Sequence, residues 1–164
     1  MADNSKPILQ IYNANNTAPQ ESWNAGELDV SNPDAYVSGN LVINVWNNKG
    51  RNTAVPDLVG CNITTKNING DNTDEQVVTE KWVHACVDSM SSSFSPIGGN
   101  TVLPIAHQNA SSADRTAMVI KGTANNGSTS ATNNYAKITL KIVPGINASR
   151  EIHYFKTRVS GYYV

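Results

Sequence analysis

The stretch YAKITLKIV, residues 135–143, decides the fold class of this chain. Its residues fall into two interleaved sets, one apolar and one mostly polar: Ala136, Ile138, Leu140 and Ile142 alternate with Tyr135, Lys137, Thr139 and Lys141. Successive side chains of a β-strand point to opposite faces, so a period of two predicts a strand with one buried face. We expect the first set to face the core and the second set to face outward.

The same rhythm recurs along the chain between segments rich in Gly, Pro and Asn. It predicts further strands at residues 7–12, 41–47, 58–66, 76–88, 116–124 and 152–164. Residues 67–74 have the composition of a hairpin turn, and residues 89–105 and 125–134 that of loops. With about eight or nine strands and no convincing amphipathic helix, the sequence predicts an all-β fold. The expected architecture is a two-sheet antiparallel immunoglobulin-like β-sandwich with long loops.

Length and the absence of repeats indicate one domain. A chain of 164 residues can bury a core of its own without metal or disulfide staples. We expect residues 1–6 to form a flexible N-terminal tail and residues 7–164 to form a single β-sandwich domain.

The charge pattern argues against several classes of partner. The formal net charge is −1, and only 15% of residues are charged. Lys and Arg are scattered, so the chain lacks the basic patch of a nucleic-acid-binding protein. No segment approaches the roughly 18 apolar residues of a membrane-spanning helix. The opening MADNSKP has no apolar secretory signal, which predicts folding in a cytoplasm.

The stretch EKWVHACVDSM, residues 80–90, places Trp82, His84 and Cys86 two residues apart. The spacing fits one face of a strand, and this is the interpretation we favour. The alternative is a zinc site in which Cys61 and either His107 or His153 complete the ligand set. That set lacks the paired spacings of strong zinc motifs, and in a reducing compartment we expect Cys61 and Cys86 to be free thiols.

Other chemical sites are weakly indicated. A Cys–His nucleophile would also need an oxyanion hole and an orienting group, and no hydrolase, nucleotide-binding or metalloprotease motif is present. Residues 67–75, NINGDNTDE, partly resemble a calcium loop, but a solvated hairpin tip rich in turn-forming residues explains them better. The three tryptophans are expected to anchor the core rather than form a sugar platform. We therefore expect no enzymatic activity, no cofactor and no metal.

Several segments in order resemble the small accessory proteins of tailed-bacteriophage virions, chiefly head-decoration proteins with an immunoglobulin-like sandwich. The segments are SWNAGELDV, INVWNNKG, VGCNITTKNINGDNT, VVTEKWVHACVDSM, FSPIGG and NNYAKITLKI. They cover most of the chain from Trp23 onward, although none is specific for a chemical activity.

This resemblance implies a non-enzymatic structural protein that decorates and stabilises the capsid exterior by binding the major capsid protein or another virion protein. It implies a homo-oligomer, with a trimer as one form, that is assembled in the host cytoplasm and located in the virion. The alternative is a carbohydrate- or receptor-binding sandwich of a phage tail or cell surface. Both chain ends are expected to contact partners, through Ile8, Leu9, Ile11, Tyr12, Tyr162, Tyr163 and Val164.

Overall fold

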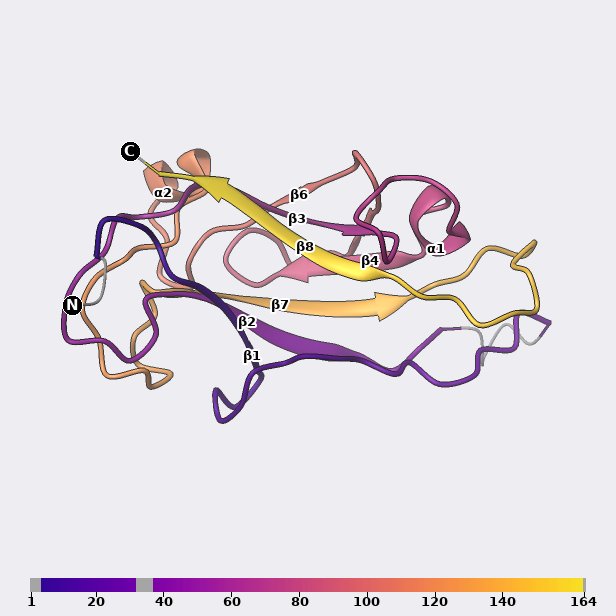
Figure 1. The fold of residues 1–164 in the computed structure, drawn as a ribbon, viewed down its shortest axis with the longest axis horizontal. Coiled ribbons are helices and arrows are strands. Elements are labelled where there is room, and N and C mark those ends of the chain that lie inside the picture. Colours follow the sequence, from indigo (N-terminus) through magenta and orange to yellow (C-terminus); the bar gives the residue numbers. More distant parts are fainter. Residues whose placement is uncertain (1–3, 32–36, 164) are drawn as a thin grey trace.

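The computed structural model describes residues 4–31 and 37–163 as an all-β sandwich of two antiparallel sheets with two short helices (Figure 1). Residues 1–3 of the expected tail, residues 32–36 and Val164 lie outside the described part. The strands are β1 (Leu9–Asn13), β2 (Leu41–Asn47), β3 (Val59–Lys66), β4 (Val83–Val87), β5 (Ser95–Ile97), β6 (Leu103–Pro104), β7 (Tyr135–Ile142) and β8 (Lys156–Tyr162). The helices are α1 (Gln76–Thr79) and α2 (Ser112–Ala117), which lie towards opposite ends of the sandwich.

One sheet has five strands in the order β1-β2-β7-β4-β5, and the other has three in the order β6-β3-β8. The alternation in β7 is confirmed, since Ile138 and Leu140 are buried and pair with Ile43 and Leu41 of β2. Tyr135 faces the other side but is also buried, because its ring stacks on Trp46 with centroids 4.6 Å apart. The outer face of the sheet is therefore covered at this end.

The three-stranded sheet is centred on β3, whose Cys61, Ile63 and Thr65 are fully buried. The β3–β8 register shifts between Val59 and Asn62, which marks a bulge. Gly60 lies there with a φ of 64°, and a Cβ at this position would lie 2.5 Å from the Tyr162 ring. Only glycine therefore allows the last residue of β8 to pack flat on the bulge.

The prediction of a strand over residues 76–88 is wrong in its first half. Residues 76–79 form α1, and Lys81 takes a left-handed conformation with a φ of 57°. This turn places Trp82 before β4 and packs its ring into the core with Val83 and Ala85. Trp82 therefore does not share a strand face with His84 and Cys86, as the spacing had suggested.

Residues 116–124 were predicted to be a strand and are not one. Ser111 caps a helix by accepting a hydrogen bond from the Asp114 N–H, and α2 continues to Ala117. Met118 ends it in a left-handed conformation. Beyond it, Ile120 forms an isolated bridge with Leu58.

Two loop predictions also need correction. Residues 67–74 do not form a hairpin turn, because they connect β3 of one sheet to α1 and then to β4 of the other. Residues 89–105, predicted to be a loop, contain the short strands β5 and β6. Their Pro, Ser and Gly content concealed the strands: β5 pairs with β4 just before it in the chain, whereas β6 pairs with the distant β3.

Buried asparagines hold the loops at the end of the sandwich opposite α1. The Asn134 amide donates to the carbonyl oxygens of Asn47, Lys121 and Thr123 at 2.8–3.2 Å, and its Oδ1 accepts from the Thr123 hydroxyl. Asn48 donates to the carbonyl oxygens of Thr53, Gly122 and Thr123 at 2.8–3.1 Å. These side chains thus supply buried hydrogen-bond donors to the loop carbonyl groups.

Replacing Asn134 with Ala should lower the free energy of unfolding by about 2–4 kcal/mol, because three carbonyl groups lose a buried donor. Asn133→Ala is the matched control, since that side chain is exposed and makes a single long contact of 3.5 Å with Asn109. Urea denaturation measures both. Equal, small losses in the two variants would contradict a structural role for the buried amide.

Candidate functional site

The two sheets differ in width, and the wider one is incompletely covered along β1. Leu9 and Ile11 pair with Asn47 and Val45, which are fully buried on the inner face of the sheet. Directly paired residues share a face, so Leu9 and Ile11 also point into the sandwich. Leu9 is nevertheless 42% exposed. The interior is therefore open beside β1.

The opposite wall of this opening comes from β8 and the residue before it. Thr157 and Val159 pair with Thr65 and Ile63, so they point inward from the three-stranded sheet. Two adjoining hollows lie between the walls, and the one at the α1 end has a volume of about 350 Å³. We call them together the β1–β8 groove. Its apolar lining includes Leu9, Ile11, Trp23, Leu41, Phe155 and Val159.

The end of the groove near α1 is closed by aromatic packing. The Trp23 ring meets the Phe155 ring edge to face, with centroids 6.4 Å apart and planes at 87°. This contact fastens the irregular segment after β1 to the start of β8. Ile11, Lys156 and Thr157 line both hollows, so the groove is continuous from this closed end towards Leu9.

The outer edge of β8 is open. Within residues 4–31 and 37–163, the backbone of β8 forms hydrogen bonds only with β3. The outer edge of β1 is instead covered, since Ile11 O accepts from Gln20 N–H at 3.0 Å and Asn13 N–H donates to Ala18 O at 2.9 Å. With seven residues, β8 is longer than the outermost strands β5 and β6. It therefore offers the longest unpaired edge for strand addition.

Unpaired cations border this edge. Lys156 and Arg158 are exposed on the outer face of β8, and Lys66 is the direct cross-strand neighbour of Lys156. None of the three lies within 4.0 Å of a carboxylate in the described part of the chain. Lys66 instead donates to the Asn72 side chain. Like charges on neighbouring strands repel, so an incoming carboxylate would relieve this repulsion.

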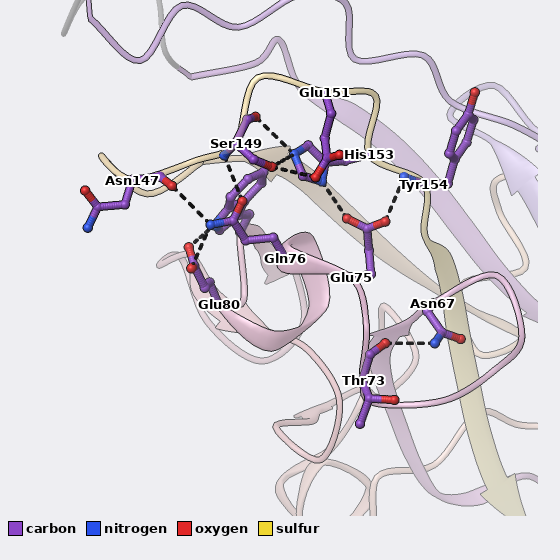
Figure 2. A network of polar contacts seen from close by, with 11 residues as sticks. Asn67, Thr73, Glu75, Gln76, Glu80, Asn147, Ser149, Glu151, His153 and Tyr154 are labelled. Carbon is purple, nitrogen blue, oxygen red and sulfur yellow. Dashed lines mark hydrogen bonds and ion pairs between the residues drawn. The ribbon is translucent and has the colours of Figure 1, made fainter.

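A polar cluster at the α1 end fixes the chain that leads into β8 (Figure 2). Glu75 Oε1 lies 2.5 Å from His153 Nδ1, and its Oε2 accepts from the Tyr154 N–H at 3.3 Å. Gln76 Oε1 accepts from the Ser149 N–H at 2.9 Å, and its amide donates to the Asn147 carbonyl at 3.2 Å. These contacts hold residues 147–154 against α1 and so position the wall of the groove.

Ser149, His153 and Glu75 have the connectivity of a hydrolase triad, with Ser149 Oγ 3.1 Å from His153 Nε2. Ser149 Oγ also lies 2.8 Å from Glu151 Oε1, and a carboxylate can only accept a hydrogen bond. The hydroxyl therefore donates to Glu151 rather than to the imidazole. The Ser149 N–H is already bonded to Gln76, so it is not free to stabilise an oxyanion. The hydrogen bonds among Glu75, Ser149, Glu151 and His153 therefore form a structural network, which we call the Glu75–His153 clasp. They do not activate Ser149 as a nucleophile.

The proposed zinc ligands do not come together. His153 contacts Glu75 and the Trp82 ring, whereas His107 is buried with Nε2 3.1 Å from Asp114 Oδ2. Over the ranges that the structure describes, no three His, Cys, Asp or Glu side chains are placed to hold a metal ion.

The cysteines are free and buried, as predicted. Burial raises the pKa of the Cys61 thiol to about 12. Burial, together with the charge of Asp88, also raises the pKa of Cys86. Burial and the nearby Lys141 lower the pKa of His84. Thiols that stay protonated at neutral pH are poor nucleophiles and poor metal ligands.

The calcium-like loop uses its own donors internally. Asn67 Oδ1 accepts from the N–H groups of Asn69 and Asp71 at 2.9 Å each, and its amide donates to Thr73 O at 2.8 Å. Such contacts are typical of an Asx turn, although this turn is not the tip of the predicted hairpin.

The residues predicted to contact partners do not form one surface. Leu9 and Ile11 line the groove, and Tyr162 and Tyr163, at the end of β8, are 60% and 43% exposed. Ile8 is half-buried, and its N–H donates to Asn47 Oδ1. Tyr12 lies beneath the Lys49 ammonium on the outer face. Val164 is outside the described residues.

Sequence reasoning missed most of the groove. Phe155, Thr157 and Val159 alternate with Lys156 and Arg158, which is a readable strand pattern with one basic face. The pattern predicted the strand but gave no sign that its outer edge lacks a neighbour. That property depends on sheet order, which is set by pairing between distant segments.

The chain is thus a two-sheet antiparallel sandwich with an open, basic-edged groove. Comparison with models of known protein families found no match, and searches of curated proteins and of solved structures also found none. Within the described residues, no helix is long and apolar enough to cross a bilayer. Inference about function therefore rests on the groove and its surroundings.

Replacing Glu75 with Gln should lower the free energy of unfolding by about 1–3 kcal/mol, because a largely buried, charge-assisted hydrogen bond to His153 is lost. The Tyr154 amide should also exchange with solvent faster, since it donates to the same carboxylate. Urea denaturation and amide hydrogen exchange measure the two effects.

Glu151→Gln is the control for this clasp, because Glu151 is exposed and contacts Ser149 alone among the described residues. Its effect should stay within about 0.5 kcal/mol. A loss in Glu151→Gln equal to that in Glu75→Gln would contradict the role assigned to the Glu75–His153 pair.

Proposed function

We propose that this chain is a non-enzymatic structural protein of a bacteriophage virion, which decorates and stabilises the capsid exterior by binding the major capsid protein and further copies of itself. The observation that carries the proposal is the β1–β8 groove. Leu9 points into the sandwich yet is exposed, and no strand of the described residues lies beside the outer edge of β8. A surface of this kind gains from covering by another protein chain.

The surface chemistry supports an assembly role. Roughly one residue in eight is Asn, and the net charge is only −1. Neutral amides and hydroxyls form hydrogen bonds across an interface without the desolvation cost of buried charge. On a symmetric capsid, many weak copies of one contact combine into durable attachment. A homo-oligomer such as a trimer would add to this effect.

The immunoglobulin-like assignment is the finer part of the proposal. It is supported by two antiparallel sheets packed face to face around one core, with long connections at both ends. Such a sandwich presents loops and strand edges on a rigid frame. The buried amides of Asn48 and Asn134 contribute to that rigidity.

The alternative functions have less support from the geometry. A glycan platform needs exposed aromatic faces, but Trp46 and Trp82 are buried and Trp23 packs on Phe155. A hydrolase needs a free nucleophile, but the Ser149 hydroxyl donates to Glu151. Among the described residues, the exposed Tyr154, Tyr162 and Tyr163 are the aromatic groups that remain for a sugar-binding role.

Quantitative mass spectrometry of purified particles tests the proposal. We expect the chain to be present at a fixed ratio to the major capsid protein, because a decoration protein occupies equivalent positions of a lattice. Absence from washed particles, or a copy number that varies between preparations, would overturn the proposal.

Rebinding of purified chain to particles that lack it tests the groove separately. Leu9→Ser should reduce occupancy several-fold, because it removes an apolar anchor of the groove. Ile146→Ser is the matched control, since Ile146 is 85% exposed and does not line the groove. Equal occupancy for the two variants would remove the groove from the assembly contact.

A further inference from the structure

Residues 26–31 have the alternating pattern of a β-strand but belong to neither sheet among the described residues. In this segment Glu27 and Asp29 are exposed, whereas Leu28 and Val30 are partly buried, so acidic and apolar side chains alternate. Residues 21–31 make no backbone–backbone hydrogen bond within the part of the chain that the structure describes. Neither Glu27 nor Asp29 has a Lys or Arg nitrogen within 4.0 Å there.

The outer edge of β8 has the complementary pattern. Lys156 and Arg158 are exposed and form no ion pair with any residue that the structure describes, whereas Thr157 and Val159 point inward. A strand added to this edge places alternate side chains over the groove and the others beside the cations. Acidic residues at every second position and apolar residues between them satisfy both requirements.

We propose that residues 26–31 of one copy of this chain add as a strand to the free edge of β8 in a second copy. The inference rests on the proposed function, because it takes the β1–β8 groove to be an assembly surface. Leu28 and Val30 cover the exposed side of Leu9 and Ile11. Glu27 and Asp29 meet Lys156 and Arg158, and arginine can bind a carboxylate through two parallel hydrogen bonds.

We assign the added strand to a second copy because, within one chain, residues 26–31 do not lie along the free edge of β8. Asp29 is near Arg150, in the connection between β7 and β8, and no ion pair joins the acidic segment to the β8 cations within the described residues. Trp23, packed on Phe155, anchors the segment at its start. Leu28 packs partly on the core of its own chain, so the exchange replaces this contact with one in the neighbouring copy, while Trp23 stays in place.

Such an exchange joins two copies through unlike surfaces: the acidic segment of one copy meets the β8 edge of the next. A heterologous contact of this kind closes into a ring when its rotation permits, and otherwise continues into a filament. A closed ring of three copies agrees with the trimer considered above. Each copy then gives one strand and receives one, so that every groove in the ring is covered.

Charge reversal on the full-length chain tests this proposal. Sedimentation velocity should show oligomers of the unmodified chain. Both E27K/D29K and K156E/R158E should self-associate about tenfold more weakly or worse, because each places like charges in contact. An equimolar mixture of the two variants should associate again, since each segment then meets an edge of opposite charge. K81E/R115E, which changes exposed residues away from the groove, should behave like the unmodified chain.

A peptide probe keeps the test independent of oligomer folding. The peptide acetyl-NAGELDVS-amide, residues 24–31, should bind the E27K/D29K variant and shift the amide NMR signals of β8. The amides of Glu27 and Asp29 point to one side of the added strand and those of Leu28 and Val30 to the other, so only one of these pairs donates to β8. N-methylation of the pair that donates to β8 should abolish binding, and N-methylation of the other pair should leave binding unchanged.

The proposal is overturned if the unmodified chain is monomeric at all concentrations, if the mixed variants stay apart, or if the peptide does not bind. Oligomers that survive both reversals would assign the contact to another surface and also overturn it. A monomeric chain that is nevertheless present in purified particles would reject this inference and leave the capsid role standing. An oligomer that is absent from particles would reject the capsid role and leave this inference standing.

Discussion

The structure depends on packing a five-stranded sheet against a three-stranded one. A sheet with an apolar inner face must be covered across its width, because exposed apolar area and unpaired strand edges both promote association. β3 and β6 cover the side of β4 and β5, whereas β8 stands alone over the side of β1 and β2. The open groove, the exposure of Leu9 and the free edge of β8 all follow from this mismatch.

Neutral polar side chains hold the rest of the molecule together. At the end opposite α1, buried amides of Asn48 and Asn134 satisfy loop carbonyls that have no strand partner. At the α1 end, Glu75 and Gln76 fasten residues 147–154 beside the groove. The high Asn content thus has a structural use: amides take the place of regular backbone ladders in long connections.

Sequence patterns predicted the regular strands well and the connections poorly. The alternation in residues 135–143 corresponds to β7, and β2, β3 and β8 lie within their predicted ranges. Residues 76–79 misled the prediction, because Val77 and Val78 have high β propensity but are held in a helical turn. The helix at residues 112–117 is capped by the Ser111 hydroxyl, in a segment whose composition otherwise indicates a loop. The candidate site was half predictable: Leu9 and Ile11 were identified as apolar residues near the chain end, but their position opposite β8 depends on long-range packing.

Amide hydrogen exchange along β8 tests the central claim most directly. In a dilute, monomeric sample, every second amide of Lys156–Tyr162 should exchange rapidly, while the amides that donate to β3 exchange slowly. The rapidly exchanging amides should become protected as the concentration rises and the chains associate. Uniform protection of β8 in the monomer would contradict the account, because it would show that the second sheet is already complete.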